Sequence, residues 1–449
     1  MQTEFPILVA VWLLACSMAA PVEAQSTTSA PGAVRGVFGA DGPVGPARTT
    51  QQLSAWFDVG GGFDENVNAA NGSGASEVRT RGTATTATAS MRLWHGRTTR
   101  SIEANARVFR NNQRSGGSTA TGGEVNLIGG VSGRRGGLHV ALRGANESAL
   151  LFGAIASPGS PTSTAPAVDT QIAVPDVSPQ QGIVNARWYA VGGSTSGERD
   201  WSPRQRTIVQ YSQLQRRPTE GNGEESDQRV AGLRHDWMPR LTAGLFATYR
   251  QERVEQTLRE ALRTEPVRIQ TAEAGGRYER RYSPIRAFAT TVQVGAAHVL
   301  ASPAALGVDG ALEPTGSVTA SYTLTRRWAV VGSAMRSLTI LQGVSQTPFS
   351  IDVASLSING VMARRVTLFV SGSVSKGSAL NSGQGAFDAV GGSAALRYGF
   401  RYGGLFVGYT RYEHHLRELA SANRSIPLRF NQSSLRLGVT LWLPLYGAF

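Results

Sequence analysis

The sequence predicts an all-β fold, a transmembrane antiparallel up-and-down β-barrel of about 18 strands (16 to 18). Apolar and polar residues alternate with a period of two over stretches of about ten residues from residue 51 onward, which is typical of strands with two different faces. Short and long connections alternate between these stretches. No stretch shows a comparable 3.6-residue period, although 251–263 and 411–421 fit short helices in loops.

The composition narrows the class of protein. The chain has 449 residues, a formal net charge of +13, 53 glycines and 17% charged residues, whereas soluble domains carry roughly 25% charged residues. Ile7–Ala20 is the only long apolar run, so a helical membrane protein, which needs about 20 apolar residues for each span, is excluded. The regular recurrence of apolar residues argues against a disordered chain.

The N-terminus is typical of an export signal. Ile7–Ala20 forms its apolar region, and Val22-Glu23-Ala24 is a small-residue cleavage site before Gln25. The first residues depart from the pattern, because they carry Glu4 and no lysine or arginine. We therefore expect a signal peptide over 1–24, a Gly/Pro/Ala-rich periplasmic linker over 25–50, and a barrel over 51–449.

Cys16, the only cysteine, lies within the predicted signal peptide. Its surroundings loosely resemble a lipoprotein lipobox, which leaves a lipidated N-terminus as an alternative. In either case no disulfide, thiol nucleophile or Cys-ligated metal is expected in the mature chain.

The alternation of apolar and polar residues predicts the individual strands. Residues 101–108 place apolar side chains at every second position, and residues 434–443 near the end of the chain do the same. The apolar positions of these two stretches are Ile102, Ala104, Ala106, Val108, Leu435, Leu437, Val439, Leu441 and Leu443. Each stretch therefore presents one face suited to lipid and one suited to water.

The connections give the strand count. Short basic turns are expected near 95–99, 133–137, 199–206, 236–240, 282–285, 325–327, 363–365 and 401–404. Longer Gly/Ser/Asn-rich loops are expected near 64–76, 111–122, 147–182, 216–227, 251–268, 300–314, 338–350, 376–386 and 413–427. Eight turns and nine loops join 18 strands and leave both chain ends on the short-turn side, which is the periplasmic side of bacterial outer-membrane barrels.

A closed barrel satisfies the requirement that every backbone group in lipid be paired within the protein. The chain ends at Phe449 after an alternating strand, which resembles the C-terminal aromatic signal that directs outer-membrane barrels to the barrel-assembly machinery. Pro444 departs from that signal and is expected at the end of the strand, where a missing N–H is tolerated. A soluble β-sandwich array, propeller or β-helix is disfavoured, because these folds use shorter strands and a regular repeat.

Tryptophans cluster near the short turns, as in the aromatic girdle of a membrane barrel. These residues are Trp94, Trp201, Trp237, Trp328 and Trp442. Trp94 and Trp442 share the alternation of the polar residues, which places them in the lumen instead.

The first strand closes with Gly62-Phe63-Asp64-Glu65-Asn66-Val67. This segment, together with the barrel layout and the aromatic–x–Pro–Arg turns, resembles porin-like outer-membrane barrels, some of which are associated with exopolysaccharide systems. The resemblance implies a porin-like channel in the cell outer membrane, in contact with outer-membrane lipid and lipopolysaccharide. A TonB-dependent receptor is disfavoured, because such proteins have a larger barrel preceded by a plug domain.

An 18-stranded barrel leaves an aqueous channel unless something fills it. The longest loop, Glu147–Gly182, is the third long loop, a placement that resembles the constriction loop of porins. Its only charged residues are Glu147, Asp169 and Asp176. The alternative is a surface-exposed or adhesive loop.

Arginine supplies 43 of the 44 basic residues, and Lys376 is the only lysine. A GC-rich genome explains much of this excess, and arginines near the short turns are explained as solvated turn residues. Other arginines share the polar face of their strands and would favour anions in the lumen, with carboxylates partly neutralising them. The predicted pore-lining residues are Arg92, Arg107, Arg143, Arg187, Arg277, Arg397, Arg436, Asp58 and Glu103.

No catalytic residue, metal site or cofactor is predicted. Ser373-x-x-Lys376 has the spacing of a Ser–Lys pair, but on a strand these two positions face opposite ways. Glu413-His414-His415 would offer metal ligands only on a helix, and a solvated loop is favoured.

The acidic segment 223–227 is expected to be a hydrated loop, or a bridge through divalent cations to lipopolysaccharide phosphates. Nucleic-acid binding is disfavoured, because no recognition motif accompanies the positive charge.

The sequence thus predicts a non-enzymatic outer-membrane channel for passive diffusion of small hydrophilic solutes, with a preference for anions. The main alternative is a barrel that transports nothing and serves as a scaffold or secretion partner for surface polysaccharide. An outer-membrane hydrolase is a third, less favoured hypothesis. The oligomeric state, monomer or trimer, stays open.

Overall fold

The computed structural model describes residues 51–69, 77–97, 100–113, 118–148, 187–218, 225–240, 242–257, 266–283, 285–301, 307–325, 327–340, 347–380, 385–400, 402–417 and 429–446. The predicted signal peptide (1–24), the linker (25–50) and Phe449 lie outside these residues. No helix in the described ranges is long and apolar enough to cross a membrane.

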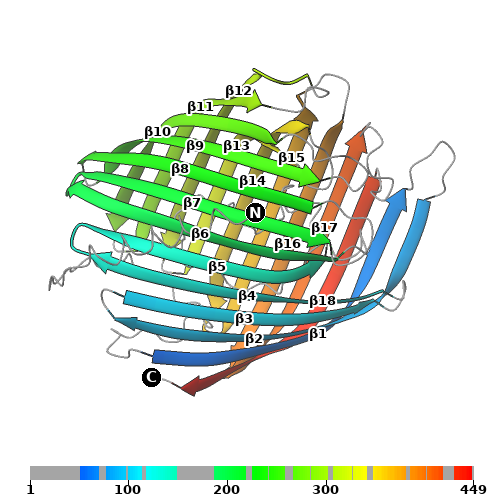
Figure 1. The fold of residues 1–449 in the computed structure, drawn as a ribbon. Coiled ribbons are helices and arrows are strands. Elements are labelled where there is room, and N and C mark those ends of the chain that lie inside the picture. Colours follow the sequence, from blue (N-terminus) through cyan, green and yellow to red (C-terminus); the bar gives the residue numbers. More distant parts are fainter. Residues whose placement is uncertain are drawn as a thin grey trace, which may run out of the picture.

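The described residues form one closed antiparallel barrel, so the predicted fold class is confirmed (Figure 1). Each strand pairs with its neighbours in sequence, and β1 also pairs with β18. The strands are β1 (Gln51–Ala69), β2 (Glu77–Arg97), β3 (Arg100–Gln113), β4 (Ser118–Gly133), β5 (Gly136–Ser148), β6 (Arg187–Ser202), β7 (Gln205–Pro218), β8 (Glu225–Arg240), β9 (Ala243–Thr257), β10 (Val267–Ser283), β11 (Arg286–Ala301), β12 (Leu312–Thr325), β13 (Trp328–Ile340), β14 (Pro348–Ala363), β15 (Val366–Ala379), β16 (Ala386–Phe400), β17 (Gly403–Arg417) and β18 (Arg429–Tyr446).

The connections follow the predicted alternation. Two-residue turns join β2 to β3, β4 to β5, and each later even-numbered strand to the next, with the β6–β7 turn at 203–204. Longer segments join each odd-numbered strand to the next, and the longest spans 149–186 between β5 and β6. The short turns therefore share one end of the barrel with the start of β1 and the end of β18. In bacterial outer-membrane barrels in general, the short turns lie on the periplasmic side.

Two local expectations were wrong. Residues 251–257 and 411–417 are strand, as the ends of β9 and β17, and not short helices. Both segments pair with a neighbouring strand over their described length. Backbone hydrogen bonds to an adjacent strand thus override a local pattern that is compatible with a helix.

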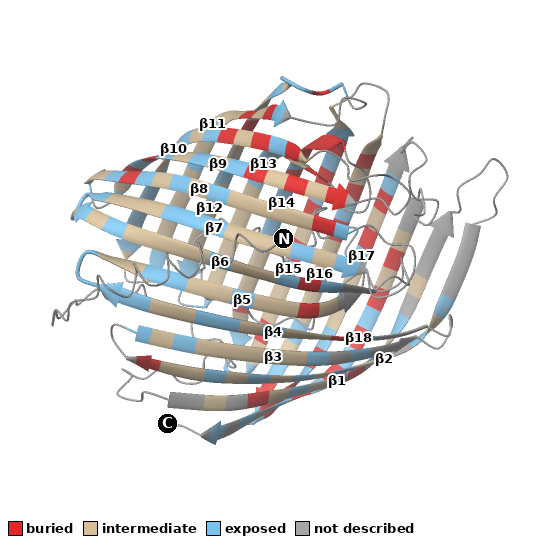
Figure 2. Cartoon of the chain, viewed as in Figure 1, coloured by how far each residue is buried: buried red, intermediate tan, exposed pale blue. Residues whose placement is uncertain are grey.

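Apolar side chains cover the outer wall. Val59, Val191 and Val294 are 61%, 62% and 66% exposed, and their neighbours two residues away are mostly apolar as well. The intervening positions are mostly polar or small and face inward, where buried residues gather, most densely on the later strands (Figure 2). An apolar exterior and a polar interior are the pattern of a barrel that spans a lipid bilayer.

Aromatic residues mark the short-turn end of the outer wall. Trp201 and Trp237 are exposed, and the ring of Trp328 covers Gly360 on the neighbouring strand. Arg199 places its guanidinium carbon 4.6 Å from the Trp201 ring centre. These contacts agree with the predicted girdle, whereas Trp94 alternates with the inward side of β2, and the side chain of Trp442 lies outside the described part.

At the loop end the outer wall becomes charged. Arg336, Asp352, Lys376 and Asp388 stand directly opposite one another on β13 to β16, with alternating sign. Opposite charges on facing strand positions attract each other, and charges cost about 0–1 kcal/mol near the membrane interface compared with about 2–4 kcal/mol for Arg or Lys at the midplane. The row therefore marks the edge of the apolar outer surface on the side of the long connections.

Inward aromatic rings lie flat against the wall. A Cβ added at Gly438 would lie 2.4 Å from Phe406 Cζ, and one at Gly275 would lie 2.6 Å from Phe246 Cζ. In each case the phenylalanine and the glycine lie on adjacent strands. Because each ring rests over a position without a side chain, it takes little room from the lumen.

Candidate functional site

The barrel interior is the candidate site. An 18-stranded barrel is wide enough to enclose an aqueous channel, and its properties are set by the inward side chains. These side chains differ from one wall of the barrel to the next.

The wall formed by β2 to β5 carries ion pairs. Arg92 Nε lies 2.9 Å from Glu103 Oε1, and Arg143 Nε lies 3.0 Å from Glu124 Oε1. Asn105 and Asn126 donate to the same two carboxylates at 2.8 and 2.9 Å. Positive and negative groups alternate across these strands, so the charges of this wall offset each other to a large extent.

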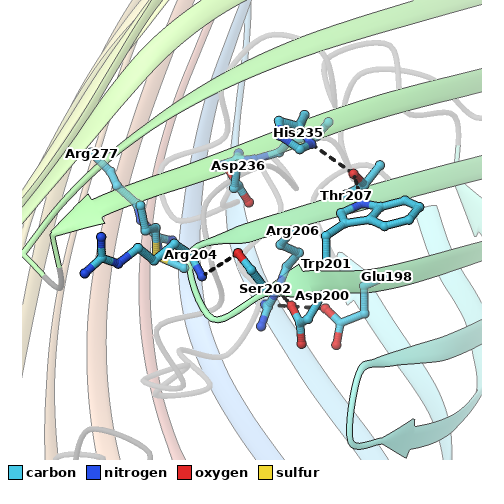
Figure 3. A network of polar contacts seen from close by, with 12 residues as sticks. Glu198, Asp200, Trp201, Ser202, Arg204, Arg206, Thr207, His235, Asp236 and Arg277 are labelled. Carbon is cyan, nitrogen blue, oxygen red and sulfur yellow. Dashed lines mark hydrogen bonds and ion pairs between the residues drawn. The ribbon is translucent and has the colours of Figure 1, made fainter.

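The wall formed by β6 to β9 carries a second network, near the short turns (Figure 3). Arg206 Nε donates to Asp200 Oδ1 at 2.7 Å, and Arg206 Nη1 is 3.5 Å from Glu198 Oε2. Arg234 Nε donates to Asp236 Oδ1 at 2.8 Å, and its guanidinium carbon lies 4.1 Å from the Phe246 ring centre. These guanidinium groups are held in place by carboxylates at the short-turn end of the lumen.

The opposite side of the same strands faces outward. Trp201 Nε1 donates to Thr207 Oγ1 at 2.8 Å, and Thr207 Oγ1 is 2.9 Å from His235 Nδ1. Thr207 and His235 lie on the outer face, directly opposite each other on β7 and β8. This contact satisfies polar groups beside the aromatic girdle and adds nothing to the lumen.

The next wall, β9 to β11, is mixed. Arg277 is exposed, alternates with the inward side of β10, and donates from Nη2 to the sulfur of Met238. Glu252 accepts a hydrogen bond from Gln228 at 2.8 Å, and Glu273 accepts one from Gln293 at 3.1 Å. Above them, toward the loops, a buried apolar cluster comprises Val254, Val267, Ile269, Ala297, Val299, Val308, Leu338 and Ile340.

The wall formed by β11 to β18 carries two rows of hydroxyl groups, which we call the hydroxyl track. The strand register aligns each member with the next across neighbouring strands. The first row is Ser357, Ser371, Ser393, Thr410 and Ser434, on β14 to β18. The second row is Thr291, Thr319, Ser333, Ser355 and Ser373, on β11 to β15.

Hydrogen bonds join members of the track. Ser371 Oγ and Ser393 Oγ are 2.7 Å apart, as are Ser333 Oγ and Ser355 Oγ. The rows contain no ionisable residue. This half of the lumen therefore differs in kind from the ion-paired half formed by β2 to β9.

Polar groups of β16 to β18 surround the end of the track. Tyr412 and His414 are buried, with ring centres 5.8 Å apart, and Arg436 is 4% exposed. Arg397 faces inward on β16, and the charge of Asp58 on β1 acts on it. The barrel closure thus brings a carboxylate from the start of the chain near an arginine close to its end.

Most of the predicted pore-lining residues alternate with the inward side of their strands. These residues are Arg92, Arg107, Arg143, Arg277, Arg397, Arg436, Asp58 and Glu103. Arg107 stands opposite Glu124. The side chain of Arg187 lies outside the described residues, and so do the predicted constriction-loop residues Asp169 and Asp176 and the side chain of Glu147.

Sequence reasoning missed the network of Asp200, Arg206, Arg234 and Asp236, and it missed the hydroxyl track. Alternation could have found Arg234, which is flanked by the outward Leu233. The track gave no such signal, because serine and threonine are ordinary on any polar face and only the register lines them up across strands.

The motifs considered for catalysis do not assemble. Ser373 is buried on the inner face while Lys376 is exposed on the outer face. His414 faces inward, whereas Glu413 and His415 alternate with the outward side of β17. Among the described residues no group of three or more His, Cys, Asp or Glu side chains could hold a metal ion. In the acidic segment, residues 225–227 form the start of β8 and not a loop, and Asp227 accepts from Arg229 at 2.9 Å.

A groove of about 690 Å³ crosses β11 to β16 on the outer wall. Val294, Val318, Val374 and Val390 line it, and the charged row of Arg336 to Asp388 borders it. Because its lining faces away from the lumen, the groove belongs to the lipid-facing surface and not to the candidate channel.

No protein-family model matches the chain, and no curated protein matches it. Among solved structures, the chain is similar to OccK2 (OpdF) of Pseudomonas aeruginosa in complex with glucuronate, with 8% identity, a TM-score of 0.45, and coverage of 88% of this chain and 98% of that one. It is similar to OccK5 (OpdH) of P. aeruginosa, with 11% identity, a TM-score of 0.45, and coverage of 88% and 99%. It is also similar to OccAB3 of Acinetobacter baumannii, with 10% identity, a TM-score of 0.43, and coverage of 88% and 99%. At these values the fold assignment rests on this chain's own strand register, and no function is carried over.

Proposed function

We propose that this protein is a porin-like channel of the bacterial outer membrane, through which small hydrophilic solutes diffuse passively. One observation carries the proposal: a closed barrel of 18 strands with an apolar exterior and a polar, ion-paired and hydroxyl-lined interior. Such an interior solvates water and polar solutes, while the exterior is compatible with lipid. The channel needs no catalytic group or cofactor for this role.

The preference for anions expected from the sequence stays part of the proposal, in a weaker form. Carboxylates neutralise much of the arginine charge on β2 to β9, as shown by the Arg143–Glu124 and Arg206–Asp200 distances of 3.0 and 2.7 Å. Arg277, Arg397 and Arg436 add positive charge to the remaining walls, where Asp58, Glu252 and Glu273 add negative charge. Arg277 is exposed whereas Glu252 is buried, so the positive charge is the more accessible to a solute on β9 and β10. Accessible positive charge in a confined lumen raises the local concentration of anions.

Single-channel recording in planar bilayers tests the proposal. With the mature protein refolded and inserted, we expect steady conductance steps, and under a salt gradient a reversal potential that modestly favours anions. Folding is checked independently by heat-modifiable electrophoretic mobility. A folded barrel that gives no conductance steps would contradict the channel function and favour the alternative, a scaffold or secretion partner for surface polysaccharide.

The proposal includes contacts with the assembly machinery and with lipopolysaccharide. Deleting Phe449 is expected to lower the amount of assembled barrel in cells, because the C-terminal aromatic residue resembles the insertion signal of outer-membrane barrels. Refolding of the purified variant into detergent, which needs no machinery, should proceed as for the parent protein. Equal amounts of assembled parent and variant in cells would contradict this role for Phe449.

A further inference from the structure

The hydroxyl track has a chemistry that the proposed channel function leaves unexplained. Its members lie on adjacent strands, each opposite the next, and form a continuous polar surface from β11 to β18. Ser357, Ser393 and Thr410 are only partly buried. Salt bridges dominate the wall formed by β2 to β9, so the two halves of the lumen offer different partners to a solute.

Hydroxyl groups suit one class of solute in particular. A serine or threonine hydroxyl donates one hydrogen bond and accepts two. In a pair such as Ser371 and Ser393, one hydroxyl donates to the other, and the remaining donor and lone pairs can meet a further group. A solute with many hydroxyls can therefore exchange its bonds to water for bonds to the wall in many orientations.

A second observation marks one end of the track. Ser434 is 2% exposed and Gln432 is 5% exposed, and both alternate with the inward side of β18. Ser434 Oγ and Gln432 Oε1 have no hydrogen-bond partner among the described residues. A buried polar atom without a partner is costly, so such groups are usually satisfied by water or a ligand.

We infer that the hydroxyl track is a binding surface for neutral polyhydroxylated solutes, that is, saccharides and polyols, which move along it through the lumen. This inference rests on the proposed channel function and adds the substrate class. The solute hydroxyls hydrogen-bond to the serine and threonine hydroxyls and to Ser434 Oγ and Gln432 Oε1. No net charge on the solute is required.

Swelling of liposomes that contain the full-length mature barrel tests the inference. The measured quantity is the uptake rate of a neutral hexose divided by that of a polyethylene glycol of the same hydrodynamic radius. The ether oxygens of the glycol accept hydrogen bonds, but its chain cannot donate along the track. For the parent protein we expect a ratio well above one, and a ratio of one would overturn the inference.

Two variants remove hydroxyls without adding volume. Ser434→Ala should lower the ratio about twofold, and the triple variant Ser357→Ala, Ser371→Ala, Ser393→Ala about fivefold or more, because each substitution removes a hydrogen bond to the solute and the losses multiply. Ser433→Ala, on the outer face of β18 beside Ser434, is the matched control and should leave the ratio unchanged. Unaltered ratios for both lumen variants, or an equal fall for Ser433→Ala, would overturn the inference.

Ionic conductance distinguishes a failure of the proposed channel function from a failure of the hydroxyl track alone. Heat-modifiable electrophoretic mobility shows that each variant is folded, and Ser433→Ala, on the outer face of β18, should carry the same potassium chloride current as the parent. If the folded parent carries no current, the proposed channel function fails, and the substrate class with it. If the parent carries current but the hexose ratio does not depend on the hydroxyls, only the role of the track fails.

Discussion

Replacing Gly62 by alanine should destabilise the barrel by about 2 kcal/mol, within the range of 1–3 kcal/mol typical of overpacking. A Cβ at Gly62 would lie 2.0 Å from the carbonyl oxygen of Leu435 and 2.9 Å from Arg436 Cδ. The nearest atom is backbone, so β1 and β18 must move apart to relieve the clash. This pair of strands closes the barrel. The measurement is the urea midpoint of unfolding in detergent micelles, followed by heat-modifiable mobility.

Gly61 provides the matched control. It neighbours Gly62 on the same strand, is exposed on the outer face, and has no atom within 4 Å of an added Cβ. Alanine there should stabilise the barrel by roughly 0.5–1 kcal/mol, because glycine loses more conformational freedom on folding. The two neighbouring substitutions thus have opposite expected signs. Equal midpoints for both variants would contradict the close packing of β1 on β18.

Adding Arg436→Ala to Gly62→Ala tests which atom causes the clash. Since the shortest approach is to the backbone of Leu435, truncating the arginine should not restore stability. Recovery of the parent midpoint in the double variant would show that the clash is with the flexible Arg436 side chain and not with the backbone of β18.

The second large effect concerns ion selectivity. Glu124→Gln should raise the ratio of anion to cation permeability by about two- to fivefold at low salt, the range expected from roughly 0.5–1 kcal/mol of charge interaction in a hydrated lumen. Glu124 faces Arg143 at 3.0 Å and stands opposite Arg107. The amide retains the shape of the side chain but removes the charge that offsets these arginines. The reversal potential under a salt gradient is the measurement.

Two further variants and a change of salt concentration serve as controls for this measurement. Arg143→Gln, on the same ion pair, should shift the selectivity toward cations. Glu65→Gln removes a carboxylate from the pair with Arg81 on the outer wall, where the charged atoms are 2.6 Å apart, and should leave the selectivity unchanged. The effects should shrink at 1 M salt, where the Debye length is about 3 Å. A shift from Glu65→Gln as large as that from Glu124→Gln would show that the lumen charges do not set the selectivity.

Much of the fold was predictable because its signals are local. Side chains of a strand point to alternate faces, so the alternation in Ile102–Val108 predicts both the strand and its two faces without knowledge of its partners. Turn residues such as Asp200-Trp201-Ser202-Pro203-Arg204 mark the ends of strands for the same reason. The errors fell at 251–257 and 411–417, where pairing with a neighbouring strand extended β9 and β17 beyond the locally expected ends.

The inward direction of Arg92, Arg143 and Glu103 was also predictable from alternation. Their partners were not. Whether Arg143 faces Glu124 depends on how far β4 slides along β5, and a shift of one residue would move each side chain to the other face of the sheet. The sequence predicted positive charge in the lumen that carboxylates partly neutralise, while the register showed which carboxylate pairs with which arginine.

The sequence by itself determined the strands, the short turns, the apolar outer face and the polar inner face, because each of these is a property of a few consecutive residues. Only the tertiary structure decided how β1 meets β18, which charges pair, and that serines and threonines of successive strands stand side by side in the lumen. These features depend on hydrogen bonds between strands, and at the closing seam the paired residues lie at opposite ends of the described chain. Such contacts leave no periodic trace in one sequence, because they are properties of register and closure and not of any single strand.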